Sequence, residues 1–241
     1  KEAPLDFVLW QAQAPGEPAW PSPWGPGRPG WHIECSTLAT LHLGPCIDVH
    51  GGGADLAFPH HEAEIAQSES FTGCRPFARV WMHTAMVWFE GAKMSKSLGN
   101  LVMVPDLLGR YSPDALRLYL SGQHYRQPWS YDEAELRERA RQALAWQQAG
   151  QARRGIEPAA VDECEQRFRT AMEDDLDTPR ALDAVDALAR RLLATGSGRG
   201  DGVLARATLA RLAGILGLRL GAAEPDPPIS AGWGNHRRRF G

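Results

Sequence analysis

Apolar residues recur at helical spacing through the second half of the chain. Ser112 followed by Pro113 is typical of a helix start, because serine can cap the first turn and proline suits its first position. Helical spacing then continues over residues 133–153, 161–173, 179–195 and 202–217. We therefore expect residues 105–220 to be mostly helical.

The first half of the chain alternates instead between helical and strand patterns. The expected elements are a helix over 31–43, a buried strand over 46–50 that the following glycines interrupt, a helix over 58–70 and strand material over 79–90. This alternation predicts an α/β domain with a largely parallel sheet. The Gly- and Pro-rich segment 11–30 is expected at the surface, and the tail from Ala222 is expected to be disordered and receives no function.

The composition suits a globular protein. With 241 residues and a hydrophobic fraction of 43%, one large domain or two modest domains with a real core are expected. The sequence contains no run of 18 apolar residues, so no membrane span is expected. The N-terminus does not resemble a signal peptide, so a cytoplasmic location is the default expectation. The net charge of −3 does not indicate nucleic-acid binding, although it is compatible with a local basic patch. The four cysteines form no CxxC pair, so a disulfide framework is not expected.

One group of candidate metal ligands follows from helix geometry. His60 and Glu64 are four residues apart and would share one face of a helix, whereas His61 and Glu62 would point elsewhere. Such a pair can hold two corners of a tetrahedral zinc site, with Cys35 as a third ligand from another part of the fold. The alternative is a surface ion pair and a small core cysteine.

Two further segments carry polar chemistry. The glycines at 51–53 follow the expected strand and allow a ligand to approach the backbone, and Asp55 could accept hydrogen bonds from a ribose. A tight turn is the alternative for this segment. Lys93 and Lys96, separated by small side chains, would form a cationic loop that neutralises charge on transferring phosphates. A solvated basic turn is the alternative for that loop.

Together these segments resemble a known family. Residues 93–97 match the KMSKS signature of class I aminoacyl-tRNA synthetases. In order and spacing, the chain is similar to the cysteinyl-tRNA synthetase family at residues 31–35, 50–55, 58–64, 93–100 and 172–182. The resemblance covers roughly residues 1–195. It implies part of a Rossmann-like catalytic domain over 1–104 and a helical domain over 105–220, followed by a tail over 221–241.

The resemblance implies a zinc ion at the floor of an amino-acid pocket. Cys35, His60 and Glu64 match three of the family's zinc ligands, and Trp31 matches the aromatic residue that lines the pocket. Zinc suits the selection of cysteine because a thiolate is a far better zinc ligand than a hydroxyl. Pocket shape alone would separate cysteine poorly from the nearly isosteric serine.

The resemblance also implies ATP, bound with Mg²⁺. The expected ATP contacts are His50, Gly51, Gly52, Gly53, Asp55 and Lys96. Lys93 and Lys96 are the expected catalytic residues, with Lys96 stabilising the pyrophosphate leaving group. The implied reaction activates cysteine to cysteinyl-adenylate and transfers it to tRNA(Cys), by a monomer without a membrane partner.

The sequence departs from this family at both ends. The HIGH-type motif and the first zinc cysteine are absent, and Lys1 begins at what resembles the middle of the catalytic domain. We therefore expect a fragment or a truncated gene product that is inactive, or nearly so, as a lone chain. The anticodon-recognising module that follows the family's helical domain is short or missing.

Two other functions stay open. A relative in the mycothiol pathway transfers activated cysteine to an amino-sugar inositol, and the segments that favour it are 77–79, 83–87, 124–126 and 175–179, with Trp129. Residues 58–68, with 64–68 among them, favour the tRNA enzyme instead. The third hypothesis is a non-catalytic truncated paralogue, and the intact KMSKS and zinc positions count against it. We favour the tRNA ligase.

Overall fold

The computed structural model describes residues 3–194 and 200–221. The chain divides into two compact units, each described here by itself. Unit 1 comprises residues 1–101 and 125–131, and unit 2 comprises residues 102–124 and 132–241. The division over 1–104, 105–220 and 221–241 stays a prediction, and the tail from Ala222 lies outside the described residues.

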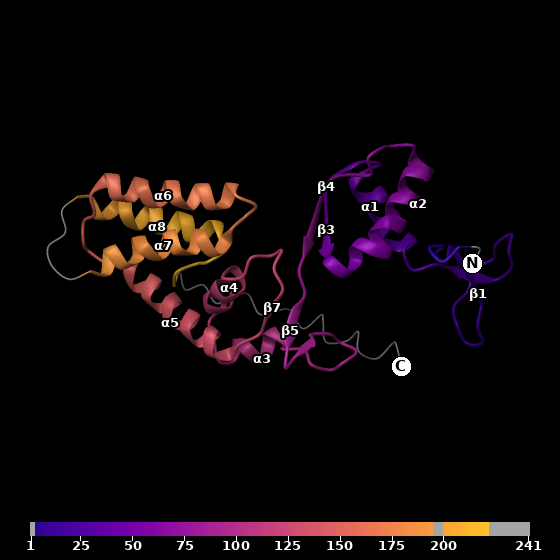
Figure 1. Ribbon diagram of the computed structural model, residues 1–241, viewed down its shortest axis with the longest axis horizontal. Helices are drawn as coiled ribbons and strands as arrows, with labels where there is room; N and C mark the ends of the chain where they lie inside the picture. The colour runs from indigo at the N-terminus through magenta and orange to yellow at the C-terminus, as the bar shows by residue number, and fades with distance from the viewer. Residues whose placement is uncertain (1–2, 195–199, 222–241) are drawn as a thin grey trace. The chain divides into compact units, whose positions relative to one another are not determined.

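Unit 1 combines short strands with two main helices (Figure 1). The segment expected at the surface contains an antiparallel pair of short strands, β1 (Trp10–Ala12) and β2 (Gly27–Pro29). The helices α1 (Ile33–Leu43) and α2 (Glu62–Thr72) pack against each other. Both lie where the sequence pattern places helices.

Two parallel strands pair in unit 1. β3 (Ile47–Gly53) follows α1 in the sequence, and β4 (Ala78–Thr84) follows α2. The prediction that the glycines interrupt β3 was wrong, because the ladder continues until Gly53 stands opposite Thr84. Glycine tolerates extended backbone, and each further residue pair adds to the ladder. The expectation of a buried strand was also wrong, since Ile47 alone within β3 is buried.

The remaining strands of unit 1 form a small sheet in the order β6-β5-β7. Its members are β5 (Val87–Phe89), β6 (Ala92–Lys93) and β7 (Trp129–Ser130). β5 runs antiparallel to β6 and parallel to β7. Residues 125–131 therefore return to unit 1 after the first helices of unit 2.

One pair of cysteines is joined within unit 1. Cys46, directly before β3, forms a disulfide with Cys74, two residues after α2, with a Cα–Cα distance of 6.0 Å. Cys35 and Cys164 are free. The expectation that the chain has no disulfide framework fails for this pair, because residues 28 apart in sequence meet only in the folded chain.

Unit 2 is helical, as the spacing of apolar residues predicts. Its helices in the described residues are α3 (Val104–Leu108), α4 (Pro113–Ser121), α5 (Glu133–Ala149), α6 (Pro158–Glu173), α7 (Thr178–Leu193) and α8 (Gly202–Ile215). The predicted start of α4 is confirmed, because the Ser112 side chain accepts a hydrogen bond from the Ala115 N–H at 3.2 Å. The helices α6, α7 and α8 lie side by side around a core that includes Trp146, Phe168 and Leu188 (Figure 1). Among the described residues, no helix is both long and apolar enough to cross a bilayer.

Candidate metal and nucleotide site

Cys35, His60 and Glu64 meet in unit 1. Their candidate ligand atoms all lie within 4.8 Å of one another. Cys35 comes from α1, Glu64 from the first turn of α2, and His60 from a π-helical turn (Ala57–His61) that leads into α2. The structure thus brings together the three side chains that the sequence nominated, well inside the ~10 Å beyond which ligands that bond zinc at roughly 2.0–2.3 Å could not share an ion.

Glu64 is the most enclosed member of this group. Its side chain is 0% exposed, and its Oε2 lies 2.9 Å from His50 Nε2 and 3.7 Å from His60 Nε2. Its Oε1 is buried and has no hydrogen-bond partner among the described residues. Because burying an unpaired carboxylate oxygen is costly, this atom fits a site in which a cation completes its interactions.

The donor set suits zinc in its chemistry. A sulfur, an imidazole nitrogen and a carboxylate oxygen are all common zinc ligands. Partial burial raises the pKa of the Cys35 thiol, and the nearby carboxylates of Glu64 and Glu34 raise it further. A divalent ion would act in the opposite direction, because it stabilises the thiolate.

Two pairs of histidines lie close to Glu64. His60 Nδ1 is 2.7 Å from His32 Nδ1, and His61 Nδ1 is 2.8 Å from His83 Nε2. The prediction that His61 points elsewhere was wrong, since its Nε2 lies 3.9 Å from Glu64 Oε2. Helical spacing could have shown this, because residues three apart are also neighbours on a helix. Burial, with His50, His83 and His60 nearby, lowers the pKa of His61 to about 4, so its imidazole is neutral at pH 7.

The glycine run borders this cluster. A Cβ atom placed on Gly52 would lie 2.8 Å from Cε1 and 3.0 Å from Nε2 of His61. Side chains do not approach so closely, and the imidazole belongs to a buried residue with little room to move. Gly52 therefore makes space for His61. The predicted ATP contacts of Gly51, Gly52 and Gly53 stay predictions, and so does that of His50, whose Nε2 faces Glu64.

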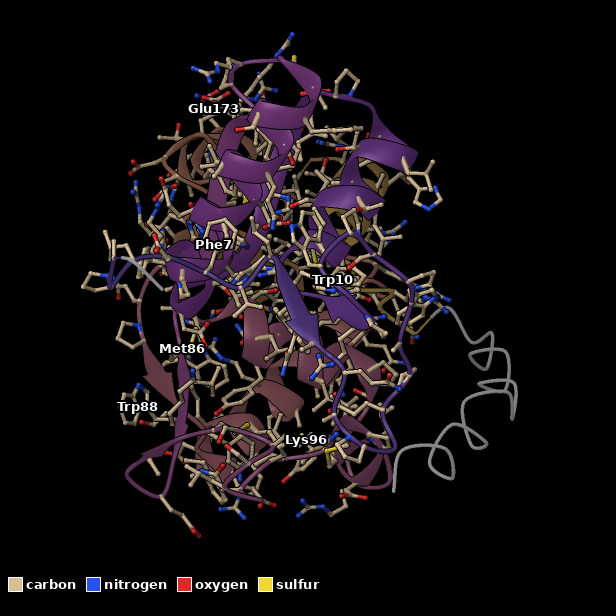
Figure 2. All side chains as sticks on the ribbon, turned by 90° about the vertical axis from the view of Figure 1, so that its right-hand side faces the viewer. Phe7, Trp10, Met86, Trp88, Lys96 and Glu173 are labelled. Atoms are coloured by element: carbon tan, nitrogen blue, oxygen red, sulfur yellow. A yellow bond between two sulfur atoms is a disulfide. The ribbon has the colours of Figure 1, made fainter. Side chains whose placement is uncertain are left out.

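The lysine loop begins at β6 and is linked to the residues after β3. Lys93 Nζ donates a hydrogen bond to Asp55 Oδ2 at 2.6 Å. This hydrogen bond is the largest cause that lowers the pKa of Asp55. Lys96, labelled in Figure 2, is exposed on the same loop. Two residues nominated for nucleotide chemistry thus touch, while Lys96 remains accessible to a ligand.

Trp31 lines a cavity of unit 1 whose lining does not include Cys35, His60 or Glu64. This cavity, of about 500 Å³, is lined by Phe7, His32 and Phe58 as well as Trp31. The indole is 77% exposed. His32 connects the cavity to the metal-ligand group through its contact with His60. The prediction that Trp31 lines the amino-acid pocket stays a prediction.

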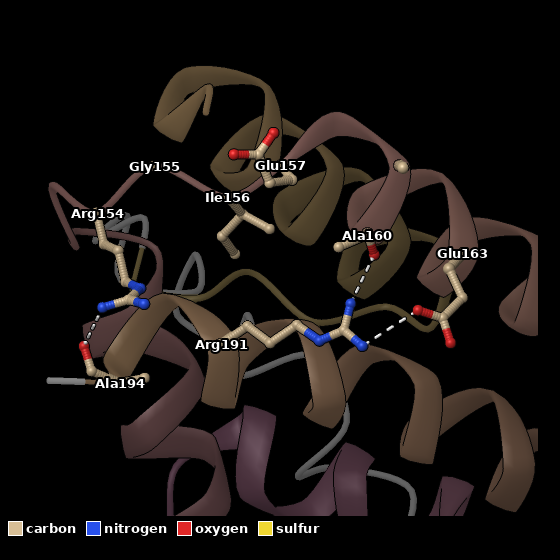
Figure 3. Close-up of a pocket in the computed structure, with 9 residues that line it drawn as sticks. Arg154, Gly155, Ile156, Glu157, Ala160, Glu163, Arg191 and Ala194 are labelled. Carbon is tan, nitrogen blue, oxygen red and sulfur yellow. Dashed lines mark hydrogen bonds and ion pairs between the residues drawn. The ribbon is translucent and has the colours of Figure 1, made fainter. Parts of the chain in front are cut away.

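Unit 2 has a cavity of its own, shown in Figure 3. Arg191 donates hydrogen bonds to the Ala160 carbonyl and to Glu163, each at 3.1 Å. Arg154 donates to the Ala194 carbonyl at 3.1 Å. Because both guanidinium groups already hold partners, we assign this cavity no function.

Solved structures with a similar fold are tRNA synthetases. A LeuRS–tRNA–LeuAMS complex from Agrobacterium radiobacter K84 aligns with a TM-score of 0.57 at 16% identity, covering 82% of this chain and 32% of that one. A putative arginyl tRNA synthetase from Campylobacter jejuni aligns with a TM-score of 0.52 at 13% identity, covering 80% and 52%. Together with the family models matched by residues 1–141 and 167–221, these likenesses confirm the predicted fold class: a Rossmann-like class I synthetase catalytic part followed by a helical domain.

Residues 1–141 match the family model of the class I (C) tRNA synthetase catalytic domain, and residues 167–221 match the DALR domain. The chain belongs to this class I tRNA synthetase family. It is 46% identical over 235 residues to a cysteine--tRNA ligase of Dehalococcoides mccartyi, covering 96% of this chain and 51% of the relative. It is 48% identical over 238 residues to that of Azotobacter vinelandii, covering 96% and 50%. The chain thus spans about half the length of these curated relatives.

Proposed function

We propose that this chain provides the cysteine-selecting metal site and part of the ATP site of a cysteine--tRNA ligase. The observation that carries the proposal is the meeting of Cys35, His60 and Glu64 within 4.8 Å. The relatives' name, cysteine--tRNA ligase, supports tRNA(Cys) as the acceptor. The geometry of the described residues adds no support for an amino-sugar acceptor or a non-catalytic paralogue.

The three side chains would hold zinc through sulfur, nitrogen and oxygen. Bound there, zinc would bind the sulfur of a substrate cysteine as the thiolate, which a serine hydroxyl cannot imitate. His32 would fix the orientation of the His60 ring through the contact between their Nδ1 atoms at 2.7 Å. His50 would orient Glu64 in the same manner through its Nε2.

The lysine loop would act on the phosphates of ATP. Lys96, exposed and flexible in its side chain, would stabilise the negative charge of the pyrophosphate leaving group. Asp55 would receive the ribose, and its hydrogen bond with Lys93 would bring the loop to the nucleotide. Glycines at 51–53 would let the adenosine approach the backbone of β3. In this proposal the protein works in the cytoplasm as a monomer, with Mg²⁺ accompanying ATP.

Cobalt can replace zinc and report on its ligands, because a thiolate bound to Co²⁺ gives a charge-transfer absorption band. We expect the wild-type chain to show this band and Cys35→Ser to lose it. L-Cysteine should change the spectrum, whereas L-serine should not. His42→Gln is a matched control, since His42 is an exposed histidine in the last turn of α1.

A wild-type chain without the thiolate band, or one that responds equally to serine, would contradict the metal assignment. The ATP assignment is tested by cysteine-dependent exchange of labelled pyrophosphate into ATP, in this chain and in the complete product of its reading frame. Where exchange is measurable, Lys96→Met should lower its rate by about 100-fold or more, as for other losses of a preorganised charge donor. Transfer of labelled cysteine to tRNA, compared with glucosaminyl-inositol, then identifies the acceptor.

A further inference from the structure

Glu64 faces a second group of potential ligands. The ligand atoms of His50, His61 and Glu64 also lie within 4.8 Å of one another. His50 Nε2 is 2.9 Å and His61 Nε2 is 3.9 Å from the same carboxylate oxygen, Oε2. The His61 side chain is 4% exposed and that of His50 is 18% exposed, so this group is more enclosed than an ordinary surface cluster.

The second group repeats the architecture of the first. In the first group, His32 contacts one nitrogen of His60 and leaves the other directed toward Glu64. In the second group, His83 contacts Nδ1 of His61 at 2.8 Å and leaves Nε2 directed toward Glu64. Metal-binding histidines commonly have their second nitrogen held in this way, because the contact fixes the tautomer and the ring orientation.

We propose that His50, His61 and Glu64 form a second binding position for a divalent transition-metal ion. It differs from the group that contains Cys35 in having no sulfur. Two imidazoles and a carboxylate suit Ni²⁺, Co²⁺ and Zn²⁺, whereas the thiolate of Cys35 favours the softer ions. This inference goes beyond the proposed selection of cysteine, because it concerns a position that a substrate thiol does not require.

The shared carboxylate makes the two positions compete. Two dications a few ångströms apart would face one carboxylate and one thiolate, and like charges repel strongly at that distance away from water. We therefore expect one ion per chain, distributed between the positions according to its preference for sulfur. Removing the sulfur should move the ion to the histidine position rather than abolish binding.

The test uses the Cys35→Ala variant, loaded with Co²⁺ in one experiment and with Ni²⁺ in another, without substrate. We expect this variant to bind one ion, measured by equilibrium dialysis, without the thiolate absorption band. Adding His61→Gln should weaken binding about 10-fold or more, because a ligand is lost together with the His83 contact that orients it. Adding His42→Gln to Cys35→Ala instead should leave the affinity unchanged.

X-ray absorption of Ni²⁺-loaded Cys35→Ala gives a second readout that does not depend on the double variant folding. Two imidazole ligands support the proposal in combination with weaker binding after His61→Gln, because His60 also faces Glu64 and the imidazole count alone does not separate the three histidines. A single imidazole would indicate His60 and would overturn it. Loss of all binding in Cys35→Ala, with an unchanged far-UV circular dichroism spectrum, would overturn it as well. The thiolate band of the wild-type chain tests the first position independently.

Discussion

The two units bury different kinds of side chain. In unit 2 the largest fully buried residues are apolar, including Trp146, Leu188 and Leu212. In unit 1 the cluster of buried apolar residues consists of Ile47, Phe77 and Ala78. The two groups of potential metal ligands there contribute the buried polar residues His60, His61 and Glu64. Unit 2 is thus stabilised mainly by hydrophobic burial, whereas the interior of unit 1 also holds ionisable side chains.

This difference predicts where each unit is vulnerable. A tightly packed apolar interior loses stability when volume is removed, because a cavity remains. A polar interior depends on covalent links, hydrogen bonds and bound ions, since its apolar area is small. In unit 1 some large apolar residues lie at the surface, as Phe71 does with 87% of its area exposed.

The largest effect is expected in the core of unit 2. Leu188→Ala should lower the free energy of unfolding by about 2–5 kcal/mol, because Leu188 is fully buried on α7 and truncation leaves a cavity. Leu144→Ala is the matched control, since Leu144 on α5 is 59% exposed. Urea denaturation measures both. Equal losses would contradict the account of unit 2 as an apolar core.

Reduction of the disulfide should affect unit 1 alone. Cleaving Cys46–Cys74 should destabilise unit 1 by roughly 2–4 kcal/mol, because the cross-link restricts the unfolded chain. Hydrogen exchange measures this as faster exchange in β3 and α2 after treatment with a phosphine reductant. Amides of α7 are the internal control, as unit 2 contains no disulfide among its described residues. An equal increase in the exchange rate of the α7 amides would show that the two units do not differ in this respect.

Ser112→Ala tests a local feature of unit 2. The serine side chain accepts the hydrogen bond of the Ala115 N–H at 3.2 Å, which would otherwise lack a helical partner. We expect a loss of about 1 kcal/mol, typical of a removed helix cap. Ser121→Ala, at the far end of α4, should change the stability less. Thermal unfolding monitored at 222 nm gives both values.

The smallest effect is expected at the contact between Asp55 and Lys93. Both side chains are substantially exposed, so the ion pair should contribute at most about 1 kcal/mol. Apart from Lys1, the lysines of the chain are Lys93 and Lys96, so endoproteinase Lys-C reports on this loop selectively. Asp55→Asn should raise the cleavage rate by up to about fivefold, which corresponds to 1 kcal/mol.

Asp48→Asn is the control for this loop experiment. Asp48, on β3, also forms an ion pair, but with an arginine: its Oδ1 lies 3.4 Å from Arg79 Nη1 on β4. Its removal should leave cleavage unchanged. Unaltered cleavage in Asp55→Asn would mean that the ion pair does not restrain the loop.

The sequence could predict what depends on neighbours along the chain. The helices of unit 2 follow from the recurrence of apolar residues, and the start of α4 follows from Ser112 and Pro113. His60 and Glu64 could be paired because they are four residues apart. Cys35 could be offered only as a candidate third ligand, since nothing local connects α1 to α2, and the family resemblance then supported it.

The remaining features depend on approach between distant segments. His83 reaches His61 across 22 residues, and Cys46 reaches Cys74 across 28. Neither distance can be obtained from a local pattern. The pairing of β7 with β5 likewise joins distant segments, and the stretch between them has a helical pattern locally. The continuation of β3 through its glycines was missed because the parallel partner β4, not the glycine backbone, decides where the strand ends.

The absent side chain of Gly52 has a consequence for how homologous sequences should be compared. A glycine at a predicted nucleotide site is usually attributed to the ligand, yet here even a methyl group would collide with the ring of His61. Positions 52 and 61 are therefore expected to vary together, with a bulkier residue at one tolerated only where the other has become smaller.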